Sequence, residues 1–321
     1  MNIRCVTPCP ALDVTYTVPE LRPHTTHRVS SASIRPGGKG VNVARLIAEH
    51  GPAGTGVSVH GFLGGPDGRR LRDLLRQVTP GIRQEWTAAA ANTRTTVAVV
   101  DLEDTTMFNE PAGPITDEEW DELIRATSEG LGVGDWVTVS GSLPPSGEGR
   151  LGELVRALRA DGARNLVDTS GPALLEAVRA GADVVKPNEE ELLAATGTES
   201  VEAGLARLRE AGPALAVVSL GERGVLAADG DRRRLIASSR RLTGNPTGAG
   251  DALVAGLVSA LHAGGEAAAS GPAEALEAGL ERAMRQGVAW SAAAVLSPVA
   301  GEIEEQVVGK LTDGITVKEL S

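Results

Sequence analysis

The sequence predicts an α/β protein in which helices cover both faces of a mostly parallel sheet and a small second sheet lies apart from it. Three observations support this fold class. Short apolar strands alternate with amphipathic helices along most of the chain, which is typical of βαβ units. Residues 13–36 and 93–112 have strand-like composition without an intervening helix. Two glycine-rich turns each lead directly into an expected helix.

Composition limits the classes of partner. The 321 residues contain no repeat, low-complexity tail or linker, so we expect one domain over residues 1–321. A formal net charge of −11 and an aromatic content of 2% argue against nucleic-acid and anionic-membrane partners. No apolar run approaches ~20 residues, and the N-terminus has no signal-peptide pattern. The two cysteines, Cys5 and Cys9, are too few for a disulfide framework. We therefore expect a reduced, soluble, cytoplasmic protein.

The expected elements begin with a strand within residues 1–13 that prolines interrupt and that ends at Asp13. Residues 14–34 have strand-like composition, and the glycine turn at 35–40 leads to a helix over 41–48. Alternation then continues, with strands at 57–63, 136–140, 165–168, 183–185 and 214–220 and helices at 67–78, 118–129, 151–160, 173–180, 189–195 and 201–211.

Residues 93–100 and 105–109 indicate two short strands around an acidic turn. Neither this region nor residues 13–36 fits a central parallel sheet, so we expect the two segments to form a lid over the site. Two helices are expected to close the chain, one from Asp251 and one over 273–295, with a surface loop at 264–272.

Residues 243–262 contain the most informative turn and helix. The apolar residues Leu253, Val254, Leu257, Val258 and Leu261 have the spacing of one buried helical face. Pro246, Gly248 and Gly250 precede that face and favour a tight turn. The free amides of such a helix N-terminus attract anions, above all phosphate. Asp251 begins the helix beside this anion site, where it is either an ordinary first-turn acid or a functional carboxylate.

Polar residues follow several of the expected parallel strands. Residues 140–145, 168–171, 186–191 and 219–224 each end a strand, and open α/β sheets bind ligands at that edge. Together with the two helix N-termini, this pattern predicts phosphate chemistry. The sequence has no P-loop motif, and the first strand leads to Asp13 rather than to a dinucleotide-binding glycine motif. The five histidines have no metal-binding spacing.

These stretches resemble the ribokinase-like (phosphofructokinase B) family of carbohydrate kinases, and within it the 1-phosphofructokinase and tagatose-6-phosphate kinase branch. The matching segments occur in the family's order over nearly the whole chain, and they are residues 8–13, 37–44, 140–145, 186–191, 219–221 and 245–251. The resemblance implies a ribokinase-like three-layer α/β/α fold with a mostly parallel central sheet and a small β-sheet lid. It also implies a homodimer through the lid as one arrangement.

The resemblance further implies the roles of individual residues. Asp251 would be the general base that takes the proton of the sugar hydroxyl as it attacks the γ-phosphorus of ATP. The amides of Gly248, Ala249 and Gly250 would hold the charge on the transferred group. Asn188 and Glu191 would hold Mg²⁺ through water. The nucleotide would be bound by Lys186, Asn188, Ser219, Gly221, Gly224 and Thr247. The sugar substrate would be bound by Asp13, Arg28, Gly37, Gly38, Lys39, Asn42, Arg94 and Ser140.

The chain departs from the family pattern where the acceptor is recognised. Cys9 stands where many relatives have Asn, and Thr26 stands where a phosphofructokinase has a lid lysine. A second lid arginine is replaced near Thr106 or Met107. These departures leave the catalytic residues intact and concern the choice of acceptor.

We expect an ATP-dependent kinase that phosphorylates a hydroxyl of a ketohexose phosphate (fructose 1-phosphate, fructose 6-phosphate or tagatose 6-phosphate) to the bisphosphate. The alternative is a kinase of an unphosphorylated sugar or a nucleoside. Tyr16 and Phe108 are the only aromatic residues in the two lid segments, which argues against stacking on a nucleoside base. A non-catalytic sugar-binding regulator of the same fold is a remote alternative.

Overall fold

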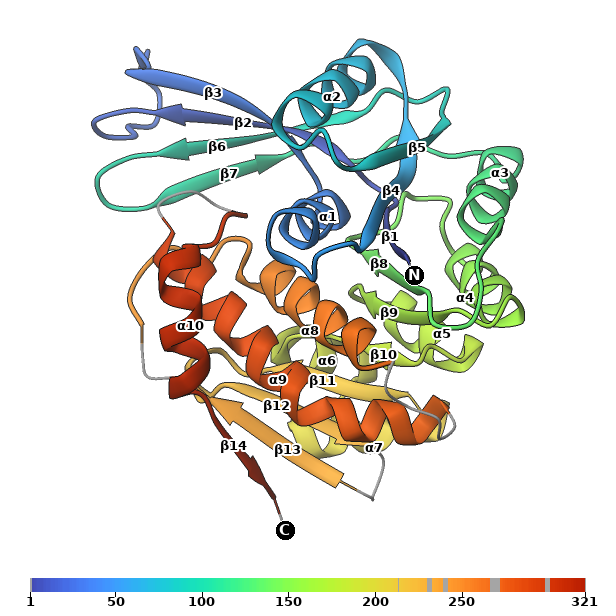
Figure 1. Ribbon diagram of the computed structural model, residues 1–321. Helices are drawn as coiled ribbons and strands as arrows, with labels where there is room; N and C mark the ends of the chain where they lie inside the picture. The colour runs from blue at the N-terminus through green and yellow to red at the C-terminus, as the bar shows by residue number, and fades with distance from the viewer. Residues whose placement is uncertain are drawn as a thin grey trace.

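A ten-stranded sheet and a four-stranded sheet organise the chain (Figure 1). This computed structural model describes residues 2–212, 214–229, 233–238, 242–265, 272–297 and 301–320. In the large sheet the strand order is β14-β13-β12-β11-β10-β9-β8-β1-β4-β5. Its strands are β1 (Asn2–Thr7), β4 (Gly56–Leu63), β5 (Arg83–Ala88), β8 (Trp136–Ser140), β9 (Arg164–Asp168), β10 (Val184–Val185), β11 (Leu215–Ser219), β12 (Val225–Asp229), β13 (Arg233–Ser238) and β14 (Thr316–Glu319). The pairings from β5 to β11 are parallel and those from β11 to β14 antiparallel, so the predicted mostly parallel sheet is confirmed.

Helices cover both faces of the large sheet (Figure 1). One face packs against α1 (Lys39–His50), α8 (Ala249–Gly265), α9 (Pro272–Leu296) and α10 (Glu305–Gly314). The other packs against α3 (Asp117–Ser128), α4 (Arg150–Ala160), α5 (Pro172–Ala180), α6 (Glu189–Thr196) and α7 (Val201–Ala211). Along β1, Ile3 and Cys5 belong to the first core and Val6 to the second, because successive side chains of a strand point to opposite faces.

Helix α8 is buried on more than the one face that its sequence pattern predicts. Leu253, Val254, Leu257 and Val258 are at most 1% exposed, and the intervening Ala252 and Ala255 are fully buried as well. The reason is that α8 packs against α1 and α9 as well as against the sheet, and all three helices lie on the same face of the sheet. This burial holds the N-terminus of α8, and with it Asp251, in a fixed position relative to the sheet.

The smaller sheet is separate and has the order β3-β2-β6-β7, as Figure 1 shows at the upper left. Its strands are β2 (Ala11–Thr17), β3 (Ser31–Gly37), β6 (Arg94–Val100) and β7 (Thr105–Asn109), and we call it the lid sheet. Leu12 of the lid sheet packs with Leu63 of β4 and with Leu71 of α2 (Gly65–Val78). The expectation of a second, smaller sheet built from these two regions is therefore confirmed.

Several expected elements differ from the observed ones. The single strand expected within residues 1–13 is wrong, because the chain leaves β1 at Thr7 and enters the lid sheet at Ala11. Pro8 and Pro10 lie in the connection, where they lack the N–H that would continue a ladder. The expectation that two helices close the chain is also wrong, since α10 and β14 follow α9. Residues 266–271 of the loop expected at 264–272 lie outside the described residues.

The sequence analysis did not predict four strands of the large sheet, namely β5, β12, β13 and β14. Strands β5 and β14 are the two edges of the sheet and carry polar, half-exposed side chains that resemble loop composition. Strands β12 and β13 follow β11 as antiparallel hairpin neighbours without the crossover helix that marked the other strands.

In the described part of the chain, no helix has the length and apolar character that crossing a membrane requires.

Candidate active site

A cavity of about 680 Å³ lies between the lid sheet and the carboxyl ends of the parallel strands. Its volume falls in the range of small-molecule sites. The lid sheet contributes residues from all four strands, and the large sheet contributes Asp168 at the end of β9 and Ser219 at the end of β11. Helices α1, α6 and α8 begin at the cavity. The cavity is lined by Lys39 in the first turn of α1, by the N-cap Asn188 of α6 and by Gly248 directly before α8. The predicted edge of the sheet therefore borders this cavity, which is the candidate site.

Asp251 is buried in the first turn of α8 and lines the cavity. The Nδ2 of Asn42, on α1, donates a hydrogen bond of 2.9 Å to its Oδ2. Burial raises the pKa of Asp251 to about 7, and the negative charge of Asp168 raises it further against the opposing effects of Asn42, Lys39 and Lys186. A carboxylate with a pKa near neutral can accept a proton at neutral pH and hold it, as a general base must.

The turn before Asp251 has the geometry that its glycines predict. Gly248 has a φ of 84°, in the region that side chains disfavour, and Gly248 and Gly250 both line the cavity. The amide of Ala249 donates to the carbonyl of Pro246 at 3.1 Å, so it stabilises the turn itself. Gly248 and Gly250 are thus the two residues of the predicted anion site that border the cavity.

A cluster of charges lies beside Asp251. Asp168 is fully buried, and its Oδ1 lies 3.2 Å from Nζ of Lys186 and 3.7 Å from Nζ of Lys39. Lys39 also lies 3.8 Å from Oε1 of Glu191. Although burial opposes the charge of Lys39, these carboxylates raise its pKa. Asp168 therefore holds two ammonium groups in the cavity, a role that the sequence analysis did not assign although it noted the polar stretch from 168 to 171.

The predicted metal-binding pair, Asn188 and Glu191, forms a capping box at the start of α6. Asn188 Oδ1 accepts from the amide of Glu191 at 2.7 Å, and Glu191 Oε2 accepts from the amide of Asn188 at 2.8 Å. Both residues also line the cavity. Among the residues that the structure describes, no group of three or more His, Cys, Asp or Glu side chains could hold a metal ion. The pair therefore has a structural role in addition to any role toward a metal.

Asp13 lies on β2 and points from the lid sheet into the cavity. Its Oδ1 accepts a 2.5 Å hydrogen bond from the hydroxyl of Thr96 on β6. Burial raises the pKa of Asp13, while Thr96, Arg94 and Arg45 oppose that rise. Gly37 does not line the cavity, but a Cβ there would lie 1.9 Å from the Asp13 carboxylate. Glycine at position 37 is thus required by the position of Asp13.

The remaining predicted substrate residues divide into two groups. Gly38, Lys39, Asn42 and Arg94 line the cavity, and Arg94 donates to the carbonyls of Glu110 and Cys9 at 3.2 and 3.5 Å. Arg28 is exposed in the β2–β3 connection and does not line the cavity. Ser140 is fully buried at the end of β8 and does not line it either.

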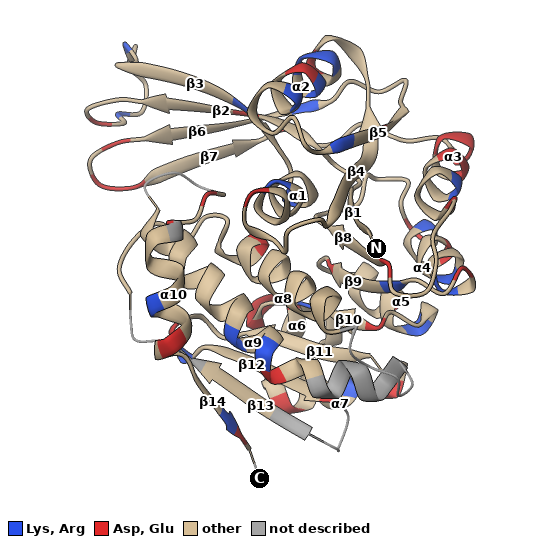
Figure 2. Cartoon of the chain, viewed as in Figure 1, with Lys and Arg blue, Asp and Glu red and all other residues tan. Residues whose placement is uncertain are grey.

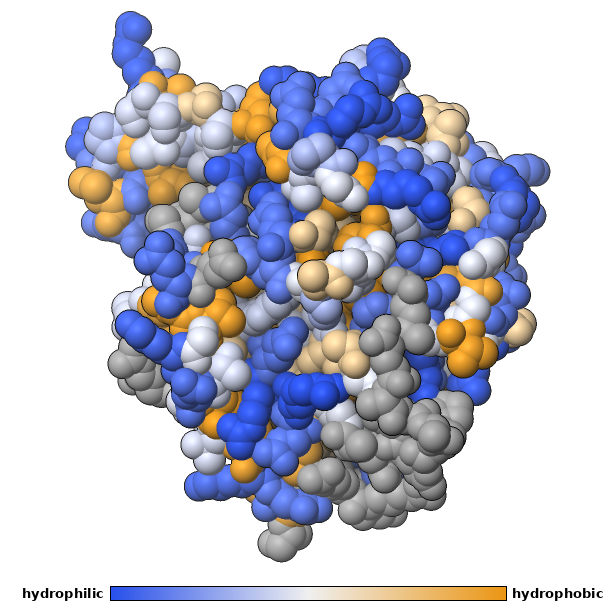
Figure 3. All heavy atoms as spheres, viewed as in Figure 1, coloured by the Kyte–Doolittle hydropathy of each residue, from blue (hydrophilic) through white to orange (hydrophobic). Residues whose placement is uncertain are grey.

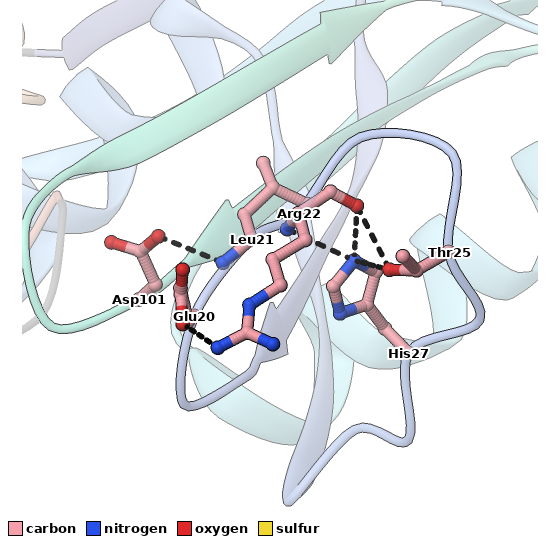
Figure 4. Close-up of polar contacts among 6 residues, drawn as sticks. All are labelled: Glu20, Leu21, Arg22, Thr25, His27 and Asp101. Carbon is pink, nitrogen blue, oxygen red and sulfur yellow. Dashed lines mark hydrogen bonds and ion pairs between the residues drawn. The ribbon is translucent and has the colours of Figure 1, made fainter.

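The β2–β3 connection has its own network of polar contacts (Figure 4). The Asp101 carboxylate accepts from the amide of Leu21 at 3.0 Å, which joins this connection to the β6–β7 turn. Arg22 pairs with Glu20 at 2.5 Å, and the amide of Arg22 donates to the ring of His27 at 3.1 Å. These residues are absent from the cavity lining among the described residues.

Of the predicted nucleotide-binding residues, Lys186, Asn188, Ser219 and Thr247 line the cavity. Gly221 and Gly224 lie in and after the short helix η1 (Gly221–Arg223), outside the lining. The structure adds lining residues that the sequence analysis missed, among them Arg35, Arg45, Thr96, Asn109, Met107 and Asn245. The alternation of side chains along a strand was the available signal for the lid residues, since Arg94, Thr96 and Ala98 share one face of β6.

The charges of the cavity differ from those of the chain as a whole. Among the described residues, five basic side chains line it (Arg35, Lys39, Arg45, Arg94 and Lys186), together with four acidic ones (Asp13, Asp168, Glu191 and Asp251). In a chain of net charge −11, this local balance favours an anionic ligand. Figure 2 shows charged residues of both signs where the lid strands approach the rest of the molecule.

The three-layer fold with its small second sheet is ribokinase-like. Residues 5–306 match the model of the pfkB family of carbohydrate kinases, and the chain belongs to this family. The predicted fold and the predicted activity class, a carbohydrate kinase, are therefore confirmed.

Individual relatives are similar along most of their length. A 1-phosphofructokinase of Rhodobacter capsulatus is 37% identical over 259 residues, which covers 78% of this chain and 80% of that protein. A 1-phosphofructokinase of Xanthomonas campestris pv. campestris is 35% identical over 272 residues, which covers 80% and 83%. The crystal structure of Escherichia coli phosphofructokinase-2 in complex with fructose-6-phosphate has a TM-score of 0.80 at 28% identity, covering 97% of this chain and 98% of that one.

Proposed function

We propose that this protein transfers the γ-phosphoryl group of ATP to a hydroxyl of a ketohexose phosphate, namely fructose 1-phosphate, fructose 6-phosphate or tagatose 6-phosphate. The observation that carries this proposal is the position of Asp251, buried beside a helix N-terminus in a cavity that five basic side chains of the described residues line. Two 1-phosphofructokinase relatives and a phosphofructokinase-2 that binds fructose-6-phosphate support the same class of acceptor.

The chemistry assigned to Asp251 is proton removal from the attacking hydroxyl. Its Oδ2 is held by Asn42, which leaves Oδ1 for the substrate. The amides of Gly248 and Gly250 at the start of α8 would stabilise the charge that develops on the transferred group. Lys186 and Lys39, held by Asp168, provide fixed positive charge beside it. Catalysis of this kind depends on positioning and electrostatics rather than on covalent chemistry.

Mg²⁺ bound with the nucleotide would neutralise phosphate charge. The residues present fit a hydrated ion, because the cap uses only Oε2 of Glu191 and leaves Oε1 at the cavity, 3.8 Å from Lys39. Mg²⁺ usually keeps several waters and needs few carboxylates. Glu191 and Asn188 are therefore the residues that we assign to hold it.

The acceptor would lie under the lid sheet. Asp13 and Asn42 offer a carboxylate and an amide to sugar hydroxyls, and Arg94 offers a guanidinium to the phosphate. We expect Arg94→Ala to raise KM for the sugar phosphate about tenfold or more, which corresponds to about 1.4 kcal/mol. KM for ATP should change little.

Arg28→Ala is the matched control, because it removes a lid arginine that does not line the cavity. Steady-state kinetics with ADP release as the readout would test both variants. An unchanged sugar-phosphate KM in Arg94→Ala, or a preference of the wild type for fructose or tagatose over their phosphates, would replace this proposal with a free-sugar kinase.

The lid sheet is also the surface that we assign to a homodimer. Its exposed apolar side chains outside the cavity lining are Tyr16 and Phe108, and Val29 and Leu102 are exposed in the β2–β3 and β6–β7 connections. Figure 3 shows apolar side chains on the lid. Exposed apolar patches are typical of protein interfaces. Phe108→Asp should convert a dimer to a monomer in light scattering, whereas a monomeric wild type would contradict this arrangement.

A further inference from the structure

The face of the lid sheet that borders the cavity has a basic residue on both sides of Asp13. In the pairing register, Asp13 on β2 lies opposite Arg35 on β3 and opposite Thr96 on β6. Arg94 is two residues before Thr96 and so shares its face of β6. Arg35 and Arg94 both line the cavity. Two strand spacings, about 10 Å, separate their strands, a distance that two long side chains can bridge around a ligand.

Arg35 is held in place by a carboxylate from another part of the chain. Its Nη1 donates to Oε1 of Glu302 at 2.5 Å, and Glu302 follows Gly301, which borders the same cavity. Arg45 of α1 lies 4.0 Å from the same Glu302 oxygen. The described contacts of Arg35 use Nη1 alone, and 40% of its side chain is exposed. Its other N–H donors remain available to a ligand in the cavity.

The opposite edge of the lid sheet offers no such cation. Met107 on β7 lies in register with Ala98 and lines the cavity at the position where the sequence analysis finds a second lid arginine replaced. Thr106 does not line the cavity. A phosphate dianion in this cavity therefore meets two cations of the lid sheet, Arg94 near the middle and Arg35 at the β3 edge.

We infer that Arg35 is a specificity-determining residue that binds the phosphate of the acceptor together with Arg94. This inference rests on the proposed function, since it concerns a phosphorylated acceptor. Arginine suits the role because its planar fork can hold two phosphate oxygens at once. Glu302 serves as the positioning residue that keeps the fork over the cavity.

The test compares Arg35→Ala, Arg35→Lys and Glu302→Gln by steady-state kinetics with fructose 1-phosphate, fructose 6-phosphate and tagatose 6-phosphate. Arg35→Ala should raise KM for the preferred sugar phosphate about tenfold and leave kcat and KM for ATP within about twofold. Arg35→Lys should recover only part of this loss, because an ammonium cannot bind two oxygens in the same plane.

Arg22→Ala is the matched control, since Arg22 is a lid arginine paired with a glutamate outside the cavity. It should leave every constant unchanged. Glu302→Gln keeps the Arg35 guanidinium and loses only the ion pair that positions it, so it should raise the sugar-phosphate KM clearly less than Arg35→Ala does. If Glu302→Gln raised this KM as much as Arg35→Ala, Arg35 would only fasten the lid sheet to the segment at Glu302, and the inference would be wrong.

The outcomes separate this inference from the proposed function. A wild type that turns over only unphosphorylated sugars contradicts the proposed function itself. A wild type that prefers a sugar phosphate, combined with an unchanged KM in Arg35→Ala, contradicts the role of Arg35 alone.

Discussion

Replacing Asp251 by asparagine should remove activity and at the same time stabilise the fold. Asparagine has nearly the same shape, and its side-chain oxygen can still accept the hydrogen bond that Asn42 donates at 2.9 Å. It cannot accept the hydroxyl proton, so kcat should fall by about 10²–10⁴-fold or more. The stability effect has the opposite sign because a buried carboxylate is costly to keep charged.

The magnitude follows from the pKa of Asp251, which burial raises from 3.8 to about 7. At a pH above both values, this cost to the folded state is of the order of 4 kcal/mol, because each tenfold change in an equilibrium is worth about 1.36 kcal/mol. The unfolded chain ionises near 3.8 and the folded chain near 7, so the stability contributed by Asp251 is lost as the pH rises between these values. The Asp251→Asn variant carries no such penalty at any pH, because its side chain does not ionise.

Urea unfolding at pH 8 and pH 5, together with ADP release under saturating substrates, would measure both effects. We expect a gain of about 2–4 kcal/mol at pH 8 and a smaller gain at pH 5. Asp117→Asn is the control, because Asp117 is an exposed first-turn acid of α3 with no place in the cavity. A kcat within a few-fold of wild type, or a stability change that does not depend on pH, would refute the assignment of Asp251 as a buried general base.

Two further predictions concern the groups around Asp251. Asn42→Ala removes the hydrogen bond that stabilises the charged Asp251 carboxylate, so the pKa of Asp251 should rise. The acid limb of the kcat/KM pH profile should therefore move upward from near pH 7 by about one pH unit, and a limb that stays in place or moves down would contradict this. Glu191→Gln should raise the Mg²⁺ concentration needed for half-maximal rate, because it removes a negative charge near the proposed metal site. The α6 cap should stay largely intact, because the glutamine oxygen can still accept a hydrogen bond from the Asn188 amide; an unchanged Mg²⁺ titration would make Glu191 a capping residue only.

The fold was predictable where hydrophobic periodicity is strong. The helix expected from Asp251 begins two residues earlier, at Ala249, and the strand expected at 136–140 has the observed bounds, because both bury apolar faces in the core. The edge strands β5 and β14 were not predictable, because their half-exposed side chains lack that signal. The crossing from β1 into the lid sheet at Pro8 depends on long-range pairing that a local pattern does not contain.

The candidate site was predictable in its backbone features and less so in its side chains. Gly248 and Gly38 have positive φ at helix starts, as their sequence context indicates. The pairing of Asp168 with Lys186 and Lys39 joins three separate segments, so only the folded chain reveals it. Arg35 likewise gains its position from Glu302, which lies 267 residues later. By contrast, Arg28 has the residue type that binds phosphate but lies outside the cavity.

We propose that Asp251 serves a kinase whose acceptor is a ketohexose phosphate. The most direct measurement is the initial rate of ADP release from ATP with fructose 1-phosphate, fructose 6-phosphate, tagatose 6-phosphate, fructose, tagatose and ribose, each over a full range of concentrations. We expect kcat/KM to be highest for one of the three sugar phosphates, and Asp251→Asn to abolish turnover of that substrate. A higher kcat/KM for any unphosphorylated sugar, or no ADP release with any of the six, would contradict it.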